Sequence, residues 1–590
     1  MRNSITFLFL FFGIAVLKAQ TKPTSEKKKD TVKTEIVNVV SSYTPTIADA
    51  FKIKKNPKIE LIERSKKKEM KYTIFSAPVA STFVPKSGAV KGINVGVKER
   101  LYNNYLAAGF GNYTTPFVEV FLHKKNRFND EYGLYAKYIS SENSIENTFL
   151  NSNYSNFESS IFYGRKERIL DWKVTFNSER NSYNWYGLPD FITDENLQNA
   201  INEEQRYNFF ELIGDLIFED SYINLTKIGV SYFSDTYQSK ELFLTTNVSF
   251  EFPLKGINAK LNDIKIDTKL EFLKGEFNQD YKGFNNLSYT LITASIQPYY
   301  QFTYRDFTIK TGLKTYFSLD TENSANNFLI YPDLKISTPI VQNYISVYTG
   351  ITGDLFTNTY KSFSDENPFV SPTLFITQTS ENYNYFLGFN GKITDKINFN
   401  IKGNYKFEED KALLLRNNSK SDGTITIANN IPLEGYEYGN SFGIFYDDVK
   451  TTTIFGEIEY EFSERIALGT NFQFDKFETK NSPEAWNLPN SKASLFGKYK
   501  QEKWYTETSI FYIGKRKKAT YNGTFPSSFS SPQNLNSYID VNLNGGYHFN
   551  DKFSAFLKLN NILNANYQRF SNFDVQGFQI LGGFTYKFDF

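Results

Sequence analysis

The 590-residue chain contains no cysteine and only two histidines. The lack of cysteine excludes a disulfide framework, a thiolate metal site, a cysteine nucleophile and a lipid anchor on a cysteine. The two histidines, His123 and His548, lie far apart in the sequence and at neither helical nor hairpin spacing. They predict no metal site, and neither has an evident catalytic partner. The chain is therefore expected not to be an enzyme and to need no cofactor.

An excess of charge of one sign is also lacking, and so are long hydrophobic runs. Lysine and arginine number 66 against 64 aspartates and glutamates, which leaves a formal net charge of +2. This balance gives no electrostatic reason to expect nucleic acid as a partner. After the first residues, no segment approaches the roughly 20 apolar residues that a helix needs to cross a bilayer.

The N-terminus predicts export from the cytoplasm. Arg2 precedes a short apolar run, Ile5 to Val16, and the small residue Ala19 stands where a signal peptidase cleaves. A run this short is typical of a secretory signal peptide, which we expect to span residues 1–20. An uncleaved anchor is the alternative.

Aromatic residues are abundant, at 17% of the chain, and many of them alternate with polar residues. Because successive side chains of a strand point to opposite faces, such alternation predicts strands with one apolar and one polar face. The pattern is clear in 210–218, 264–272, 397–407, 454–462 and 578–590. The residues predicted to face lipid include Ile264, Ile266, Leu270, Ile397, Phe399, Ile401, Ile454 and Ile458, and those predicted to face a lumen include Lys269, Lys402, Glu457 and Glu459.

Short turns separate many of these strands, and long polar loops separate others. The turns lie at 220–221, 305–306, 394–395, 463–464, 501–502 and 550–551, and the loops at 182–206, 417–437, 479–489 and 515–537. Short turns on one rim and long loops on the other are typical of an outer-membrane barrel. The alternative is a stack of soluble β-sandwiches or a propeller, but no linker divides residues 104–590.

We therefore predict an all-β fold, a transmembrane antiparallel β-barrel of the outer-membrane type over residues 104–590. Spans of about 10 residues with their loops give about 22 strands. Counting strands from the N-terminal end and from the C-terminal end assigns the same loops within residues 354–437 to opposite rims. In that range, either two strands are read as one or one strand is read as two.

The C-terminal region carries several characteristic segments. Tyr538 begins the segment YIDVNL, Leu557 begins LKLNNILNANY, and the chain ends in YKFDF. These segments, with WNLP from Trp486 onward, resemble the final hairpins of TonB-dependent outer-membrane receptors, which show an N-[LI]-L-N-x-x-Y element, a loop and a closing strand with an aromatic end. The resemblance implies that the barrel assembly machinery recognises the closing strand through Phe584, Tyr586, Phe588 and Phe590.

The other half of that family does not match. Its receptors carry a globular, glycine-rich plug ahead of the barrel, and nothing in residues 21–103 resembles one. The segment 34–40, TEIVNVV, is faintly similar to a TonB box, the extended segment that pairs with an energising protein by strand addition. The residues that would make this contact are Glu35, Ile36, Val37, Val39 and Val40. An ordinary extended segment is the alternative, and the resemblance implies a barrel whose plug is missing or collapsed.

The segments ahead of the barrel differ in composition. Residues 21–71 are lysine-rich, with runs at 27–29 and 66–68. They predict a short periplasmic arm, which is either a solvated linker or a docking arm for a periplasmic partner or an anionic envelope polymer. Residues 72–103 begin with an apolar stretch that contains Pro78 and Pro85, and we expect them to be extended at or in the barrel mouth.

Two functions fit this organisation. The first is uptake of a nutrient ligand across the outer membrane, as the family resemblance implies. The second is a plugless structural or scaffold barrel, a subunit of an outer-membrane complex. The expected location is the outer membrane of a Gram-negative envelope, with the N-terminal arm in the periplasm. The expected partners are outer-membrane lipid and the assembly machinery, with a TonB-type protein or a surface lipoprotein as further candidates.

Overall fold

The structure is a computed structural model that describes residues 102–589 except 127–128, 143–144, 147, 259–260, 284, 425–432 and 523–526. The predicted signal peptide, the lysine-rich arm, the TonB-box-like segment, nearly all of residues 72–103 and the terminal Phe590 lie outside the described residues. Within the described part of the chain, no helix is long and apolar enough to cross a membrane.

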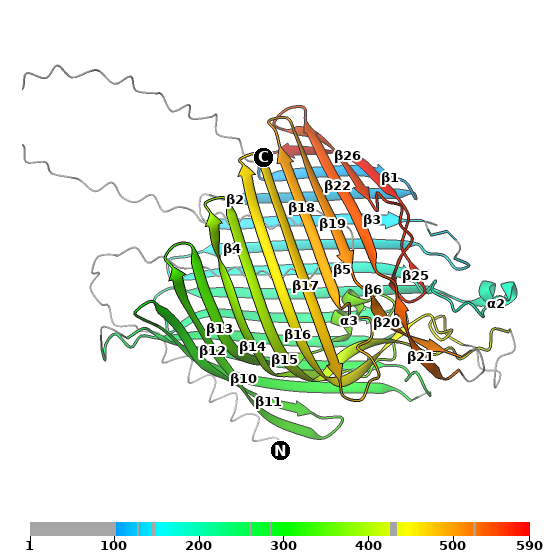
Figure 1. Cartoon of the computed structure of the whole chain (residues 1–590), viewed down its shortest axis with the longest axis horizontal. Helices are drawn as coiled ribbons and strands as arrows, with labels where there is room; N and C mark the ends of the chain where they lie inside the picture. The colour runs from blue at the N-terminus through cyan, green and yellow to red at the C-terminus, as the bar shows by residue number, and fades with distance from the viewer. Residues whose placement is uncertain are drawn as a thin grey trace, which may run out of the picture. The chain divides into compact units, whose positions relative to one another are not determined.

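One antiparallel sheet of 22 strands makes up the wall of the molecule (Figure 1). Its strands are β1 Asn104–Gly111, β2 Thr115–Lys125, β3 Asp130–Ser141, β4 Tyr154–Lys166, β5 Leu170–Asn184, β6 Glu204–Phe218, β7 Ile223–Asp235, β8 Lys240–Phe252, β9 Ile264–Phe277, β10 Leu287–Tyr304, β11 Phe307–Asp320, β12 Ala325–Val341, β13 Ile345–Thr357, β14 Gln378–Thr394, β15 Ile397–Arg416, β16 Phe442–Ser463, β17 Ile466–Thr479, β18 Ser491–Lys500, β19 Trp504–Ile513, β22 Tyr538–His548, β23 Phe553–Asn560 and β26 Gln579–Phe588.

The sheet closes because β1 pairs with β26 over its whole length, from Asn104 opposite Phe588 to Gly111 opposite Leu581. The other neighbours are consecutive in the chain, except that β19 pairs with β22 and β23 pairs with β26. A spanning sheet has to close, since no water in the hydrocarbon core can satisfy an open edge. The structure confirms the predicted antiparallel barrel and its strand number.

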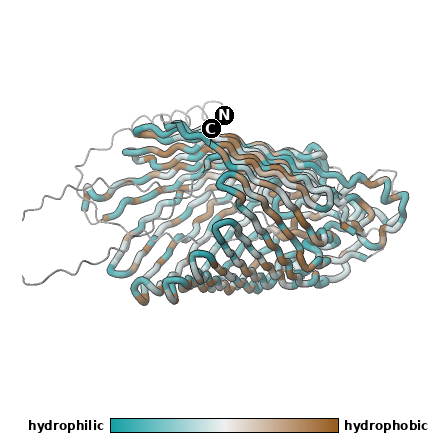
Figure 2. The backbone as a smooth tube through the Cα atoms, turned by 90° about the horizontal axis from the view of Figure 1, so that it is seen from above, coloured by the Kyte–Doolittle hydropathy of each residue, from teal (hydrophilic) through white to brown (hydrophobic). Residues whose placement is uncertain are grey.

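The two faces of the strands differ as the alternation predicts. Ile401 and Ile454 are 51% and 57% exposed on the outside of the wall. On the inside, the Lys402 ammonium lies 5.0 Å from the ring centroid of Phe386, and Lys269 Nζ lies 2.6 Å from Glu271 Oε1. Figure 2 shows a second division, along the chain: hydrophobic stretches lie within the strands, and most of the turns and loops at their ends are hydrophilic.

The two rims also differ. The start of β1 and the end of β26 lie together at what we call the termini rim, where the predicted short turns also lie. The opposite, loop rim carries the long connections, including helix α2 (Glu195–Ala200), helix α3 (Tyr360–Glu366) and the short strands β24 (Gln568–Phe570) and β25 (Phe573–Asp574). The predicted polar loop 515–537 is in fact mostly a hairpin, β20 (Arg516–Tyr521) and β21 (Phe529–Leu535), which pairs outside the barrel sheet.

The conflict between rims within residues 354–437 has a simple cause. Residues 358–377 join β13 to β14 and contain the apolar residues Phe369, Val370, Leu374, Phe375 and Ile376, yet they form no strand of the barrel. Apolar residues at this density resemble a strand in sequence. Val370, Leu374 and Ile376 are at most 1% exposed because the loop is buried, as described below, whereas Phe375 is 52% exposed.

At the closing seam, an aromatic ring lies across two glycines. Phe556 of β23 points over Gly583 of β26, where an added Cβ would lie 2.4 Å from Phe556 Cζ. The same ring reaches Gly109 of β1, where a Cβ would lie 3.1 Å away. Side chains at these two positions would force the ring off the seam, so the glycines let one ring contact three strands where the barrel closes.

The two faces can be tested by a pair of substitutions in adjacent residues. Ile401→Arg places a cation on the lipid face and should cost roughly 2–4 kcal/mol if it lies near the midplane. Lys402→Ile changes the lumen face only. We expect the first variant to yield much less heat-modifiable barrel in outer-membrane fractions than the second, and equal yields would contradict the assignment of faces.

The two rims can be tested by epitope tags. Tags inserted at Glu195 or between Asn522 and Ser527 should be labelled by antibody on intact cells, because both sites lie at the loop rim. A tag at Asn550 lies at the termini rim and should need permeabilisation. Labelling of Asn550 on intact cells would mean that the barrel has the opposite orientation.

Candidate functional site

The connection between β13 and β14 turns into the barrel instead of out from it. Thr357 and Gln378, the residues that flank it, are direct cross-strand partners, so two strands that a tight turn would join carry a long insertion. The insertion begins with helix α3, which Thr359 caps in a capping box with Ser362. Two backbone N–H groups at the start of the helix are therefore hydrogen-bonded to side chains, which makes the first turn rigid.

Helix α3 is fastened to the opposite wall by a group of polar contacts that we call the latch. The backbone N–H groups of Tyr360 and Lys361 donate to the carboxylate of Glu241 on β8, at 2.6 and 3.1 Å. The Tyr360 hydroxyl donates to Asp235 Oδ2 of β7 at 2.8 Å. Lys361 Nζ lies 2.9 Å from Glu179 Oε2 of β5. The latch thus joins the β13–β14 loop to three strands on another part of the wall.

Burial raises the energetic cost of breaking the latch. Glu241 and Asp235 are only 3% and 8% exposed, and a buried carboxylate that loses its donors costs more than one in water. Burial raises the pKa of the Tyr360 phenol well above its ordinary value, and the neighbouring Asp235 raises it further. Burial alone would lower the pKa of Lys361, but the carboxylates of Asp365 and Glu179 raise it above its ordinary value. Tyr360 therefore stays a donor and Lys361 stays charged at neutral pH.

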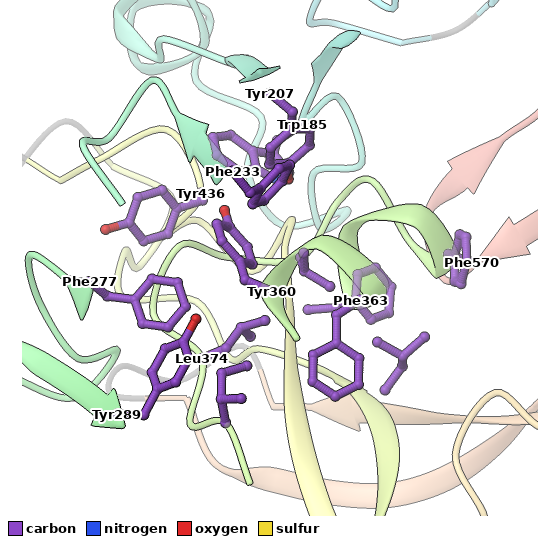
Figure 3. Close-up of a cluster of buried hydrophobic side chains, with 14 of the residues drawn as sticks. Trp185, Tyr207, Phe233, Phe277, Tyr289, Tyr360, Phe363, Leu374, Tyr436 and Phe570 are labelled. Carbon is purple, nitrogen blue, oxygen red and sulfur yellow. The ribbon is translucent and has the colours of Figure 1, made fainter. Parts of the chain in front are cut away.

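A hydrophobic cluster surrounds the latch (Figure 3). Tyr360 is fully buried, and its ring lies 5.0 Å from those of both Phe233 and Phe277 in edge-to-face contact. The cluster joins side chains from the wall to those of several loops. Its buried members are Trp185, Tyr207, Phe233, Leu273, Phe277, Tyr289, Leu291, Tyr360, Phe363, Val370, Leu374, Ile376, Leu414, Tyr436, Phe442, Phe570 and Phe573.

At the loop rim, β15 and β16 no longer have one face toward lipid. A register shift between Glu408 and Lys411 interrupts their pairing. Beyond it, Leu414 packs in the cluster of Tyr360, whereas the adjacent Leu413 packs with Val449, Trp486 and Ala519 in a second cluster. Both faces of this ribbon are buried, so here it lies between two layers of side chains and not against lipid.

The loops at the rim are tied to one another as well. Phe369 stacks on Phe573 with ring centroids 3.8 Å apart, and the Tyr186 hydroxyl donates to the carbonyl of Asp574 at 2.8 Å. The Tyr207 hydroxyl donates to the carbonyl of Pro368 at 2.9 Å. We call the assembly of residues 185–203, 358–377, 411–416, 442–449, 516–522, 527–535 and 561–578 the mouth cap. Its parts come from distant regions of the sequence, and together they occupy the loop rim.

The sequence element that resembles TonB-dependent receptors has a clear local role in this cap. The Asn561 side chain donates to the carbonyls of Ala565 and Gln576 and accepts from the N–H of Ala565. Asn564 accepts from the N–H of Phe578 at 2.7 Å, and Tyr567 stacks on Tyr538 at 3.9 Å. Asn561 and Asn564 both have positive φ, a conformation that asparagine tolerates. The element therefore fixes the loop before the closing strand.

The residues singled out from the sequence lie elsewhere. The TonB-box-like residues Glu35 to Val40 and the terminal Phe590 are outside the described residues, whereas Phe584 and Tyr586 are exposed on the outer face of β26. His123, which has no evident partner in the sequence, lies 3.2 Å from Glu131 on the neighbouring strand. His548 lies near the Tyr505 ring at the termini rim. Among the described residues, no group of three or more His, Asp or Glu side chains is arranged to hold a metal ion.

The latch residues were not identified from the sequence. Glu241 and Tyr360 are 119 residues apart, and nothing local to either residue indicates the pairing. One signal was present: a loop that contains Phe363, Phe369, Leu374 and Ile376 is too apolar to be solvated. Read in this way, the segment predicts a buried loop.

Solved structures with a similar fold are outer-membrane receptors and transporters. The FrpB iron transporter of Neisseria meningitidis gives a TM-score of 0.62 at 9% identity over 83% of this chain and 82% of that chain. The ferric enterobactin receptor PfeA of Pseudomonas aeruginosa gives 0.59 at 10% identity over 82% and 80%. The ferripyoverdine receptor of the same organism gives 0.57 at 13% identity over 83% and 72%. No family model and no curated protein matches the sequence. At these identities the likeness shows the fold alone, which this chain shares with these receptors and with the transporter.

The latch can be tested by removing a single oxygen atom. Tyr360→Phe removes the hydroxyl that donates to Asp235 and leaves a buried carboxylate without that donor, at a cost of about 1–3 kcal/mol. We expect hydrogen exchange at residues 358–377 to become faster, since those amides open with the loop. Tyr512→Phe, on the outer face of β19, is the matched control and should leave exchange unchanged. Equal exchange in both variants would show that the latch does not hold the loop.

Proposed function

We propose that the chain takes up a nutrient ligand across the outer membrane and that the mouth cap is the gate on its path. The fold supports uptake, because the similar solved structures are named as an iron transporter and as receptors for ferric siderophores. The observation that carries the proposal is the latch. The loop 358–377 is held to the far wall by an ion pair and by hydrogen bonds to carboxylates, contacts that a ligand or water can replace.

A scaffold barrel is the second candidate, and a specific observation favours it. The cap buries aromatic rings on both faces of the β15–β16 ribbon, and such packing is typical of a permanent interior. In that case the barrel would remain closed and would serve as a subunit of an outer-membrane complex. The two candidates differ in whether the β13–β14 loop moves while the rest of the cap stays folded.

The partners differ between the two candidates in the same way. Uptake against a gradient needs an energising partner, and the segment 35–40 is the candidate contact for a TonB-type protein, which would add a strand to it. A surface lipoprotein that covers the mouth cap would fit uptake equally well. Co-purification of assembly or secretion components would instead fit the scaffold.

Excision of the loop tests the gate directly. Because Thr357 and Gln378 are cross-strand partners, residues 358–377 can be replaced by a two-residue Asn-Gly turn with no change in the barrel register. We expect the variant to fold and to conduct ions in planar bilayers far better than the native protein. The matched control replaces the exposed residues 321–324, whose flanking residues Asp320 and Ala325 also pair directly, and should leave conductance low. If loop excision leaves conductance unchanged, the loop is not the gate.

The energising partner can be tested in native membranes. Val37→Pro removes a backbone donor and should abolish pairing of residues 35–40 with a TonB-type protein. We expect mild-detergent purification to recover that protein with the native chain and not with the variant. Glu60→Pro, in the same lysine-rich arm, is the control and should retain it. Recovery of assembly components in place of a TonB-type protein would favour the scaffold.

A further inference from the structure

A group of basic side chains lies on the outer face of the wall near the loop rim. Arg180 of β5 and Lys240 of β8 directly adjoin the latch residues Glu179 and Glu241, which contact α3 inside the barrel. Because successive side chains of a strand point to opposite faces, Arg180 and Lys240 point out of the barrel, and both are exposed. The outer side of the wall behind the latch therefore carries positive charge.

Two further basic residues point the same way. Arg206 of β6 follows the buried Gln205, and Lys274 of β9 follows the buried Leu273, so both also lie on the outer face. We call the four residues on this side of the wall the basic face: Arg180, Arg206, Lys240 and Lys274.

The basic face differs from the neighbouring part of the outer wall. In β10 to β13, which the structure describes in full, the same alternation places every charged side chain on the lumen side: Lys310, Lys314, Asp320, Asp333, Lys335 and Asp354. A charge on the lipid side is costly at the bilayer midplane and costs little near the interfaces. The basic face is therefore expected to lie at the level where lipid headgroups begin.

The charges of the basic face are only partly compensated. Arg206 forms an ion pair with Glu204, and Lys240 Nζ lies 3.3 Å from Glu276 Oε1. Within the described part of the chain, neither Arg180 nor Lys274 forms an ion pair. Four basic side chains thus face two acidic ones, which leaves an excess of positive charge.

The strand register arranges the basic face as two pairs of cations. Arg180 lies directly opposite Asn208, two residues from Arg206, so the two arginines are diagonal neighbours. Lys240 and Lys274 are diagonal neighbours on β8 and β9 in the same way. Strand β7 separates the two pairs, whose centres lie roughly 14 Å apart at about 4.8 Å per strand. Each pair can therefore hold a separate anionic group.

The surface between and beside the two pairs is of two kinds. Asn208 and Ser234 are direct partners on β6 and β7, and their short polar side chains lie between the arginines and the lysines. Farther from the loop rim, β6 presents Phe210 and Leu212 and β7 presents Val230, which are 42%, 49% and 40% exposed. The face thus combines two cation pairs, a polar strip between them and an apolar wall alongside.

From these features we infer that the basic face binds an acylated disaccharide that carries one phosphate at each end, a glycolipid of the outer leaflet. Each cation pair would bind one phosphate through charge-assisted hydrogen bonds. The sugar would lie over Asn208 and Ser234, and the acyl chains would lie along Phe210, Leu212 and Val230. The loop rim faces the outer leaflet because the long loops of such barrels are extracellular.

This inference goes beyond the proposed function. The basic face lies on the outside of the wall, so binding there needs neither movement of the β13–β14 loop nor an energising partner. A phospholipid with a single phosphate would occupy only one of the two cation pairs, which separates the glycolipid from other lipids of the envelope.

Native mass spectrometry of the full-length protein in mild detergent tests the inference. The probes are synthetic acylated glucosamine disaccharides with two, one or no phosphate groups, and phosphatidylglycerol. We expect the lipid with two phosphates to bind most tightly. Arg180→Gln and Lys274→Gln remove the two cations that form no ion pair, and each should weaken its binding about three- to tenfold. Neither substitution should alter binding of the lipid without phosphate.

Two controls separate this site from the rest of the wall. Lys450→Gln removes an exposed cation on the outer face of β16 that lies directly opposite Glu478, and it should leave binding unchanged. Tyr360→Phe loosens the latch on the inner side of the wall and should also retain binding, so a failure of the gate proposal would not affect this result. Heat-modifiable migration in gels confirms that each variant is folded.

Three outcomes would overturn the inference. They are equal binding of the disaccharide lipids whatever their number of phosphates, tighter binding of phosphatidylglycerol than of the lipid with two phosphates, and equal affinity of the native protein and of both the Arg180→Gln and Lys274→Gln variants.

Discussion

The structure depends on one constraint, the need to pair every backbone group that faces hydrocarbon. An open sheet would leave edge strands unpaired in the membrane, so β1 has to meet β26. With 22 strands the resulting lumen is too wide for wall side chains alone to fill. Other parts of the chain or a partner must therefore fill the lumen if the barrel is to be closed. In this chain the insertion between β13 and β14 turns into the barrel and packs there against loops of the mouth cap.

The mouth cap combines two kinds of interaction that respond differently to a ligand. Its hydrophobic clusters, such as the rings around Tyr360, give it a packed interior, and opening them would expose large apolar surfaces to water. Its latch relies on Glu241, Asp235 and Glu179, whose contacts with α3 can be exchanged for contacts with another polar partner. Under the proposed uptake function, release of the latch would free the β13–β14 loop, and the clusters would hold the rest of the cap in place. A movement restricted to the β13–β14 loop would keep most of the aromatic core intact.

The sequence predicts the strands of the barrel wall but not the loops and contacts inside the barrel. Alternation over 397–407 identified the lipid and lumen faces, because a strand repeats every two residues and each face has one environment. The same rule leaves residues 358–377 ambiguous, because burial makes this loop as apolar as a strand. The hairpin within 516–535 is polar enough to resemble a solvated loop. The latch depends on residues from a loop and three separate strands, so the arrangement of the strands had to be known first.

The composition of the cap core has a consequence for how the protein is made. Trp185 and Phe573 belong to the same cluster although 388 residues separate the neighbouring contact pair Tyr186 and Asp574. Contacts between such distant parts of a chain form late, after the strands between them are in place. The closing seam joins residues that lie even farther apart, with a separation of 484 between Asn104 and Phe588. The wall and the cap core therefore both need nearly the whole chain, and neither is complete until the C-terminal part of the chain is in place.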